Sequence, residues 1–198
     1  MEIQIVEGSL KLNKTLNDLD NFVIEFTSLL DGIGIAYVLV SGYVAILFGR
    51  NRSSEDIDII CEKCDFNKFK QLWDNLGKFE CIITSNANDA YRDYLQSGSA
   101  LRFARKNEFI PNMEIKFRKT ELDEWTLQHR KIVFLNDKKL ALSPFEIQIP
   151  FKLFLGSEKD IEDARYLYKI LEKYVDKKQM QEFCRKLKIE QKCKRYLI

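Results

Sequence analysis

The stretch from residue 37 to residue 60 constrains the fold of this chain more than any other. It begins with an apolar run that ends at Ser41-Gly42, and it continues through a segment of helical character and a loop rich in Gly, Arg and Ser. A second apolar run follows and carries Asp56 and Asp58. The pattern predicts a strand, a turn into a helix, a loop and a second strand.

The two aspartates on the second predicted strand are separated by a single residue. Because side chains alternate along a strand, Asp56 and Asp58 project from one face while Ile57 and Ile59 face the core. Two carboxylates side by side repel each other, and a divalent cation between them removes that cost. A hard ion such as Mg²⁺ takes carboxylate oxygens as ligands. The pair therefore indicates a metal-dependent phosphate chemistry.

Composition excludes several classes of protein. Of the 198 residues, 45% are hydrophobic and 31% are charged, which is typical of a globular chain with one domain of moderate size. The apolar stretch 33–48 is too short and too interrupted to span a bilayer, and the N-terminus lacks the pattern of a signal peptide. The odd count of five cysteines argues against a disulfide framework. We therefore expect a cytoplasmic protein that does not associate with a membrane.

The rest of the chain divides at about residue 143. Helical periodicity predicts a helix over residues 9–30 and a shorter one over 66–76. Short apolar or alternating runs predict strands over residues 35–40, 57–61, 79–84, 101–103, 113–118 and 131–134. After Pro144 the apolar residues follow a helical stripe. We expect an α+β core over residues 1–142 and a helical C-terminal subdomain over residues 143–198.

Four sequence elements occur in an order that one superfamily shares. Ser41-Gly42 forms a turn after the first predicted strand, and the segment 52–58 reads Arg-x-Ser-x-Asp-x-Asp. Lys152 lies on a later predicted helix, and the segment 159–163 reads Lys-Asp-x-x-Asp. In these elements the chain resembles the nucleotidyltransferase superfamily, and most closely its AbiEii-like toxin branch, although the first residue of the turn is commonly Gly there. The resemblance implies a nucleotidyltransferase-like mixed sheet with flanking helices.

The resemblance also implies a reaction and its catalytic residues. A nucleoside monophosphate would move from an NTP to an acceptor hydroxyl, with Mg²⁺ or Mn²⁺ ions held by Asp56 and Asp58. A third carboxylate normally stands on a neighbouring strand. Glu114 is the best candidate because it lies between apolar neighbours on a predicted strand, and a solvent-facing Glu114 is the alternative. Lys152 would neutralise negative charge that develops on the triphosphate.

Nucleotide phosphates would be held by the turn, the loop after it and the C-terminal helices. Backbone N–H groups that open a helix can approach a phosphate, and arginine makes bidentate phosphate contacts. The predicted nucleotide-binding residues are Ser41, Gly42, Arg50, Arg52, Ser54, Lys152, Asp160 and Asp163. In the alternative interpretation the arginines are solvated loop residues and the aspartates only cap a helix.

Other motifs give weaker signals. Cys61 and Cys64 form a single C-x-x-C pair, and neither Cys81 nor His129 is spaced as a further metal ligand. Basic residues dominate the segment 177–195 and could attract a polyanion, although a solvated helix face is the commoner explanation.

Two hypotheses of function follow. The first is a magnesium-dependent nucleotidyltransferase that uses an NTP and acts on RNA, a protein or a small molecule, with an antitoxin as partner if it is a toxin. The second is a catalytically silent domain of the same fold that binds a nucleotide, RNA or a protein partner. A general RNA-binding module is a weaker third, because no aromatic platform motif is present.

Overall fold

The computed structural model describes residues 2–6 and 9–197. Its strands are β1 (Glu2–Val6), β2 (Ser9–Asn13), β3 (Tyr37–Leu39), β4 (Asp56–Cys61), β5 (Phe79–Cys81), β6 (Leu101–Arg105), β7 (Asn112–Phe117), β8 (Lys131–Leu135) and β9 (Lys138–Leu142). Its helices are α1 (Asp18–Ile33), α2 (Gly42–Leu47), α3 (Phe66–Asp74), α4 (Ala87–Asp89), the π-helical η1 (Ala90–Leu95), α5 (Glu121–Gln128), α6 (Phe145–Leu155), α7 (Glu158–Leu171), the 3-10 turn η2 (Glu172–Tyr174), α8 (Lys177–Lys186) and α9 (Glu190–Leu197). None of the helices in this described part is long and apolar enough to cross a bilayer.

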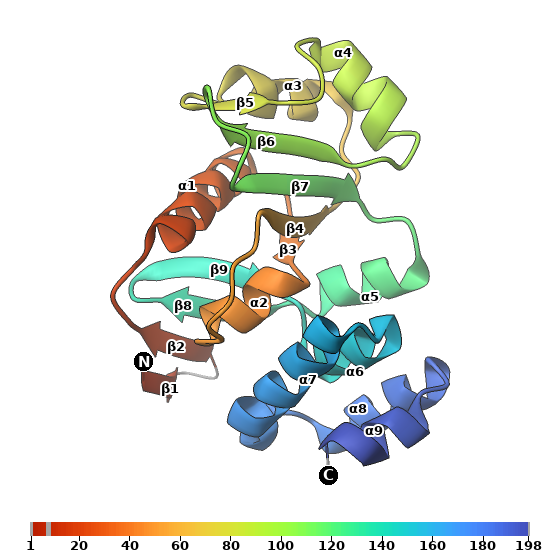
Figure 1. The fold of residues 1–198 in the computed structure, drawn as a ribbon. Coiled ribbons are helices and arrows are strands. Elements are labelled where there is room, and N and C mark those ends of the chain that lie inside the picture. Colours follow the sequence, from red (N-terminus) through yellow and green to blue (C-terminus); the bar gives the residue numbers. More distant parts are fainter. Residues whose placement is uncertain (1, 7–8, 198) are drawn as a thin grey trace.

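The strands of the described residues form one mixed sheet in the order β1-β2-β8-β9-β3-β4-β7-β6-β5 (Figure 1). In its middle, β3 runs antiparallel to β4, β4 runs parallel to β7, and β7 runs antiparallel to β6. Asp58 is therefore paired with Glu114, and Glu114 with Arg102. Directly paired residues project from the same face of a sheet, so these three side chains share one face. The mixed sheet with its helices confirms the predicted α+β class.

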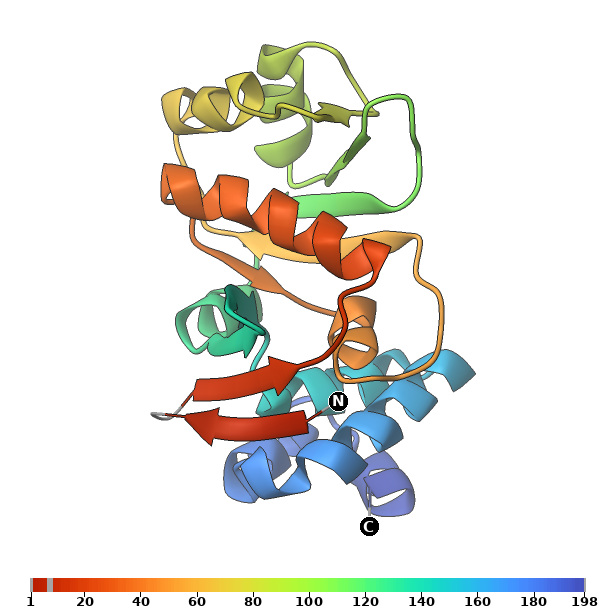
Figure 2. The same cartoon turned by 90° about the vertical axis from the view of Figure 1, so that its left-hand side faces the viewer.

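The opposite face of the same strands is apolar and forms the core. Ile57, Ile59 and Met113 are fully buried or nearly so. Phe26 of α1 packs against Phe103 of β6, with the ring centroids 5.5 Å apart, and Figure 2 shows α1 lying across these strands. The alternation predicted for β4 is thus confirmed, with its isoleucines in the core and its aspartates on the other face.

Only helices follow β9 in the described part of the chain, as the sequence predicts. The first of them, α6, begins directly after Pro144, and Pro150 lies inside it rather than at its start. Apolar side chains of α6, α7, α8 and α9 join the same buried cluster as those of the sheet. The C-terminal helices therefore pack onto the core, and the division of the chain into two domains stays a prediction.

The structure corrects the predicted first helix. Residues 9–13 form strand β2, and α1 begins only at Asp18. Leu10 and Leu12 are buried while their neighbours are less so, which is the period of a strand. Asn17 then starts the helix, because its side chain accepts a backbone N–H of the first turn. Apolar residues on both sides of this cap gave one continuous helical spacing in the sequence.

One cysteine pair also departs from expectation. Cys184 and Cys193 form a disulfide that joins α8 to α9, with their Cα atoms 6.7 Å apart. The argument from the odd cysteine count is therefore wrong for this pair, because the turn between the two helices brings the residues together. Cys61 and Cys64 are free, and burial raises the pKa of the Cys64 thiol to about 11 and that of Cys61 further.

Candidate active site

Asp56 and Asp58 stand on the polar face of β4, at the start of the strand. The Asn112 side chain of β7 donates a hydrogen bond to Oδ1 of Asp56 at 2.7 Å. Burial raises the pKa of Asp58; the charges of Glu114 and Asp56 act in the same direction, whereas the Ser41 hydroxyl and Lys116 oppose it. The site thus holds two neighbouring carboxylates that gain from a nearby cation.

The turn before α2 holds Ser41 in a conformation that favours glycine. Its φ of 61° and ψ of −130° lie where L-residues are strained. Gln148 of α6 fixes this conformation from 107 residues away, because its side-chain amide donates to the Ser41 carbonyl at 2.8 Å and accepts from the Ser41 N–H at 3.3 Å. The Ser41 hydroxyl also acts on Asp58, because it lowers the pKa of that carboxyl. The turn therefore links the carboxylate pair to α6.

Arg52 packs closely against Gly42, so that a side chain at position 42 would displace the Arg52 guanidinium. A Cβ atom at this position would lie 2.2 Å from Nη2 of Arg52 and 3.4 Å from Oγ of Ser54. The Nε atom of Arg52 is buried and has no hydrogen-bond partner in the described structure. A buried guanidinium N–H without a partner is costly and is suited to an anionic ligand such as a phosphate oxygen.

The Asp163 side chain of α7 forms ion pairs with three cationic side chains of the predicted site. Its carboxylate is fully buried and lies 2.8 Å from Nε of Arg50. Its Oδ2 atom lies 3.1 Å from both Nη2 of Arg52 and Nζ of Lys152, as ion pairs without hydrogen-bond geometry. Arg50 also pairs with Glu162. This cluster brings together residues from the loop after α2, from α6 and from α7.

Lys152 is almost fully buried, and its ammonium group donates to Oδ1 of Asp160 at 2.7 Å. Burial of Asp160 favours its protonated form, but hydrogen bonds from Lys152 and Ser157 outweigh this and lower its pKa. Lys152 is thus held between two carboxylates.

The predicted residues form one connected set. Asp58 contacts Ser41, the next residue Gly42 lies against Arg52, and Arg52 pairs with Asp163. Figures 1 and 2 both show α2 between β4 and the C-terminal helices α6 and α7, so the turn that begins α2 joins the sheet to the cationic cluster.

Glu114 contacts a residue that the sequence did not single out. Nε and Nη2 of Arg102 both donate to its Oε2 atom, at 3.0 and 2.9 Å. Gln148 and Asn112 were missed as well. Asn112 had a readable signal, because it lies two residues before Glu114 on the same strand face; Arg102 and Gln148 become visible only through strand register and helix packing.

The carboxylate pair fits a magnesium ion completed by substrate. No three His, Cys, Asp or Glu side chains converge on a possible metal position within the described residues. Mg²⁺ is commonly bound through one or two carboxylates together with substrate phosphates. Asp56 and Asp58 supply two such carboxylates on one face of the sheet, and the turn at Ser41 and Gly42 connects them to the Arg52 guanidinium.

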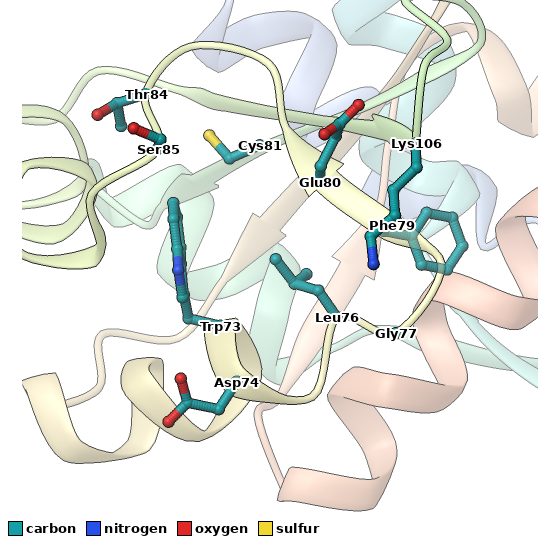
Figure 3. A pocket seen from close by; sticks show the side chains of 10 residues that line it. All are labelled: Trp73, Asp74, Leu76, Gly77, Phe79, Glu80, Cys81, Thr84, Ser85 and Lys106. Carbon is teal, nitrogen blue, oxygen red and sulfur yellow. The ribbon is translucent and has the colours of Figure 1, made fainter.

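Two surface cavities lie outside the carboxylate face, which is the face of the sheet that carries Asp56, Asp58 and Glu114. Figure 3 shows one of about 430 Å³ at the edge strand β5, between the Trp73 ring and Glu80, and it includes none of the predicted site residues. Another of about 500 Å³ touches the cationic cluster through Arg50 and Glu162. The candidate site is accordingly the open sheet face and the turn beside it.

Comparison with solved structures identifies the fold. An antigenic nucleotidyltransferase-like protein from Paracoccidioides brasiliensis superposes with a TM-score of 0.56 at 18% identity, over 91% of this chain and 92% of that one. ANT(2")-Ia, solved in complex with adenylyl-2"-tobramycin, gives 0.53 at 11% identity, over 85% and 95%. JHP933 from Helicobacter pylori gives 0.42 at 16% identity, over 78% and 68%.

No protein-family model matches the sequence, and no curated protein matches it significantly. The chain has the nucleotidyltransferase-like fold, which confirms the fold that the sequence resemblance implies. At 18% and 11% identity these structural neighbours show the fold alone, and membership of the nucleotidyltransferase superfamily and of its AbiEii-like branch stays a prediction.

Proposed function

We propose that this chain is a metal-dependent nucleotidyltransferase that moves a nucleoside monophosphate from an NTP to an acceptor hydroxyl. The observation that carries the proposal is the connected set that runs from Asp58 through Ser41 and Gly42 to Arg52 and Asp163. Through the turn it connects a carboxylate pair to a buried guanidinium N–H without a partner, on a nucleotidyltransferase-like fold.

In this proposal Asp56 and Asp58 bind Mg²⁺ or Mn²⁺, which supplies neutralisation of phosphate charge and orientation of the reacting oxygens when bound. Arg52 supplies positive charge for the triphosphate, and its Nε atom is a donor without a partner. Lys152 acts through its charge and does not touch the triphosphate, because it is buried and paired with Asp160 and Asp163. Its charge lowers the cost of negative charge that develops on the leaving pyrophosphate.

One observation favours the second candidate, a domain of this fold that binds nucleotide without transferring it. Glu114, the predicted third carboxylate, is paired with Arg102 instead of facing open space. If that pairing persists with substrate bound, the acceptor hydroxyl has no third carboxylate to take its proton.

For the acceptor of the nucleoside monophosphate, the structural neighbours suggest one class to test first. ANT(2")-Ia was solved with an adenylylated small molecule, which makes a small molecule a reasonable first acceptor to screen. RNA and protein acceptors remain open, and the toxin role with its antitoxin partner rests on the sequence resemblance alone.

Nucleotide binding can be tested by calorimetry and thermal denaturation with each of the four NTPs and Mg²⁺ or Mn²⁺. We expect at least one NTP to raise the melting temperature in a metal-dependent manner, because a ligand of the folded state stabilises it by mass action. Asp56→Asn should remove the metal dependence. Identical melting temperatures with and without all four NTPs would reject the proposal, and binding without transfer to any RNA, protein or small-molecule acceptor would favour the silent domain.

A further inference from the structure

Arg102 is the residue of the carboxylate face to which the proposed reaction assigns no role. We propose that Arg102 is a positioning residue that withholds Glu114 from the divalent cation, so that the resting site binds the ion through Asp56 and Asp58 alone. This inference rests on the proposed function, since it concerns the same metal site.

The contact between Arg102 and Glu114 is specific in geometry. The two residues are directly paired across β6 and β7. Both Nε and Nη2 of the guanidinium donate to one oxygen, Oε2, at 3.0 and 2.9 Å. Charge-assisted bonds of this kind are stronger than those between neutral groups. Within residues 2–6 and 9–197, no other side chain forms a hydrogen bond or ion pair with Glu114.

The position of the pair in the sheet explains why it affects a metal ion. Asp58, Glu114 and Arg102 form a row across three neighbouring strands. A cation that reached both Asp58 and Glu114 would stand next to the guanidinium, and two like charges at such a distance repel each other. The guanidinium stays protonated in proteins, so the repulsion persists unless the side chain moves away.

The pair contributes little to the fold, which makes the inference testable. The Arg102 side chain is 46% exposed and that of Glu114 is 25% exposed. Exposed ion pairs of this kind add little to stability. Arg102 can therefore be replaced without unfolding the chain, and its effect can be measured on the metal ion alone.

The experiment is a titration of the full chain with Mn²⁺ in the absence of nucleotide, followed by electron paramagnetic resonance of the free ion. We expect Arg102→Gln to bind Mn²⁺ about tenfold more tightly than the unchanged protein, because a cation is removed and a carboxylate is released. Glu114→Gln alone should bind Mn²⁺ no more tightly than the unchanged protein, because it leaves the Arg102 guanidinium without its counter-charge. Arg102→Gln/Glu114→Gln should lose the gain, and Arg102→Lys should fall between, since one ammonium replaces a two-bond contact.

Arg92→Gln is the matched control, because Arg92 is an exposed arginine paired with Asp93 away from the carboxylates; it should leave Mn²⁺ affinity unchanged.

Equal affinity of Arg102→Gln and the unchanged protein would overturn the inference while leaving the metal site intact. A gain that persists in the double variant would overturn it too, since the guanidinium would then act by its field and not through Glu114. Weaker binding by the double variant than by the unchanged protein would overturn the inference, because it would show that Glu114 is already a ligand. No Mn²⁺ binding by any variant, even after an NTP is added, would reject the metal site of the proposed function, and the inference with it.

Discussion

The carboxylate of Asp163 lies 2.8 Å from Nε of Arg50, although 113 residues separate the two in the sequence. Asp163 is fully buried and also pairs with Arg52 and Lys152. One carboxylate thus opposes three cationic side chains. Together with Glu162, which also pairs with Arg50, this group links the C-terminal helices to the loop before β4.

Replacement of Asp163 by Asn should destabilise the chain strongly. The variant leaves buried cations without their shared counter-ion, and loss of one partner from a buried ion pair costs about 3 kcal/mol or more. Urea denaturation followed by circular dichroism measures this loss. Glu162→Gln is the control, because it pairs with the same Arg50 but is 61% exposed, and it should cost less than about 1 kcal/mol. Equal effects of the two variants would show that the buried cluster does not hold the C-terminal helices to the loop before β4.

Asp58→Asn should stabilise the chain in the absence of ligands near neutral pH. Burial, with the charges of Glu114 and Asp56, raises the pKa of Asp58 above its ordinary value of 3.8. A carboxyl whose pKa is higher in the folded state opposes folding once it is ionised. The gain from Asn should therefore be absent below pH 3.8, should grow as the pH rises through the folded-state pKa, and should stay constant above it.

Thermal denaturation of both proteins from pH 3.5 to pH 8 checks this dependence, and a gain that is largest in acid would contradict it. The same variant should lose any stabilisation by Mg²⁺ with NTP, so that Asp58→Asn is more stable without ligands and less responsive to them.

The sequence predicted the parts of the site that depend on local pattern. The period of two along β4 placed Asp56 and Asp58 on one face and their isoleucine neighbours in the core, as the structure shows. The later motif indicated Lys152 and Asp163, and the structure places them in contact. Their roles in binding or transfer stay predictions.

Pairings between distant elements could not be predicted from the sequence. Nothing near Gln148 indicates that its amide holds Ser41, since that contact depends on how α6 packs beside the turn. Arg102 meets Glu114 only through the register of β6 and β7. By contrast, α5 was missed although its signal was present, because Thr120 and Asp123 form a capping box.

Ser41→Gly and Ser41→Ala together should separate strain from hydrogen bonding at the turn. Alanine loses the hydroxyl that lowers the pKa of Asp58 and keeps the positive φ, whereas glycine loses the same hydroxyl and relaxes the backbone. We expect Ser41→Gly to be about 1 kcal/mol more stable than Ser41→Ala, because a non-glycine residue in this region of φ and ψ is strained by that order. Chemical denaturation of the two variants measures the difference. Equal stability would mean that Gln148 and its neighbours hold the turn without strain.

Gly42→Ala should weaken nucleotide binding while it preserves the fold. The added Cβ would meet Nη2 of Arg52 at 2.2 Å, so the guanidinium must leave its place over the turn and its ion pair with Asp163. Only the end of a side chain has to move, and Asp163 keeps its ion pairs with Arg50 and Lys152, so the cost to the fold should be small. The stabilisation of the chain by NTP and Mg²⁺ in thermal denaturation should therefore fall by most of its value, while the melting temperature without ligands changes little.

Gly32→Ala is the matched control, because a Cβ there meets nothing within 4 Å and alanine is favoured in a helix; it should keep the full response to nucleotide. A Gly42→Ala protein that also keeps that response would show that the position of Arg52 against the turn is not needed to bind the triphosphate.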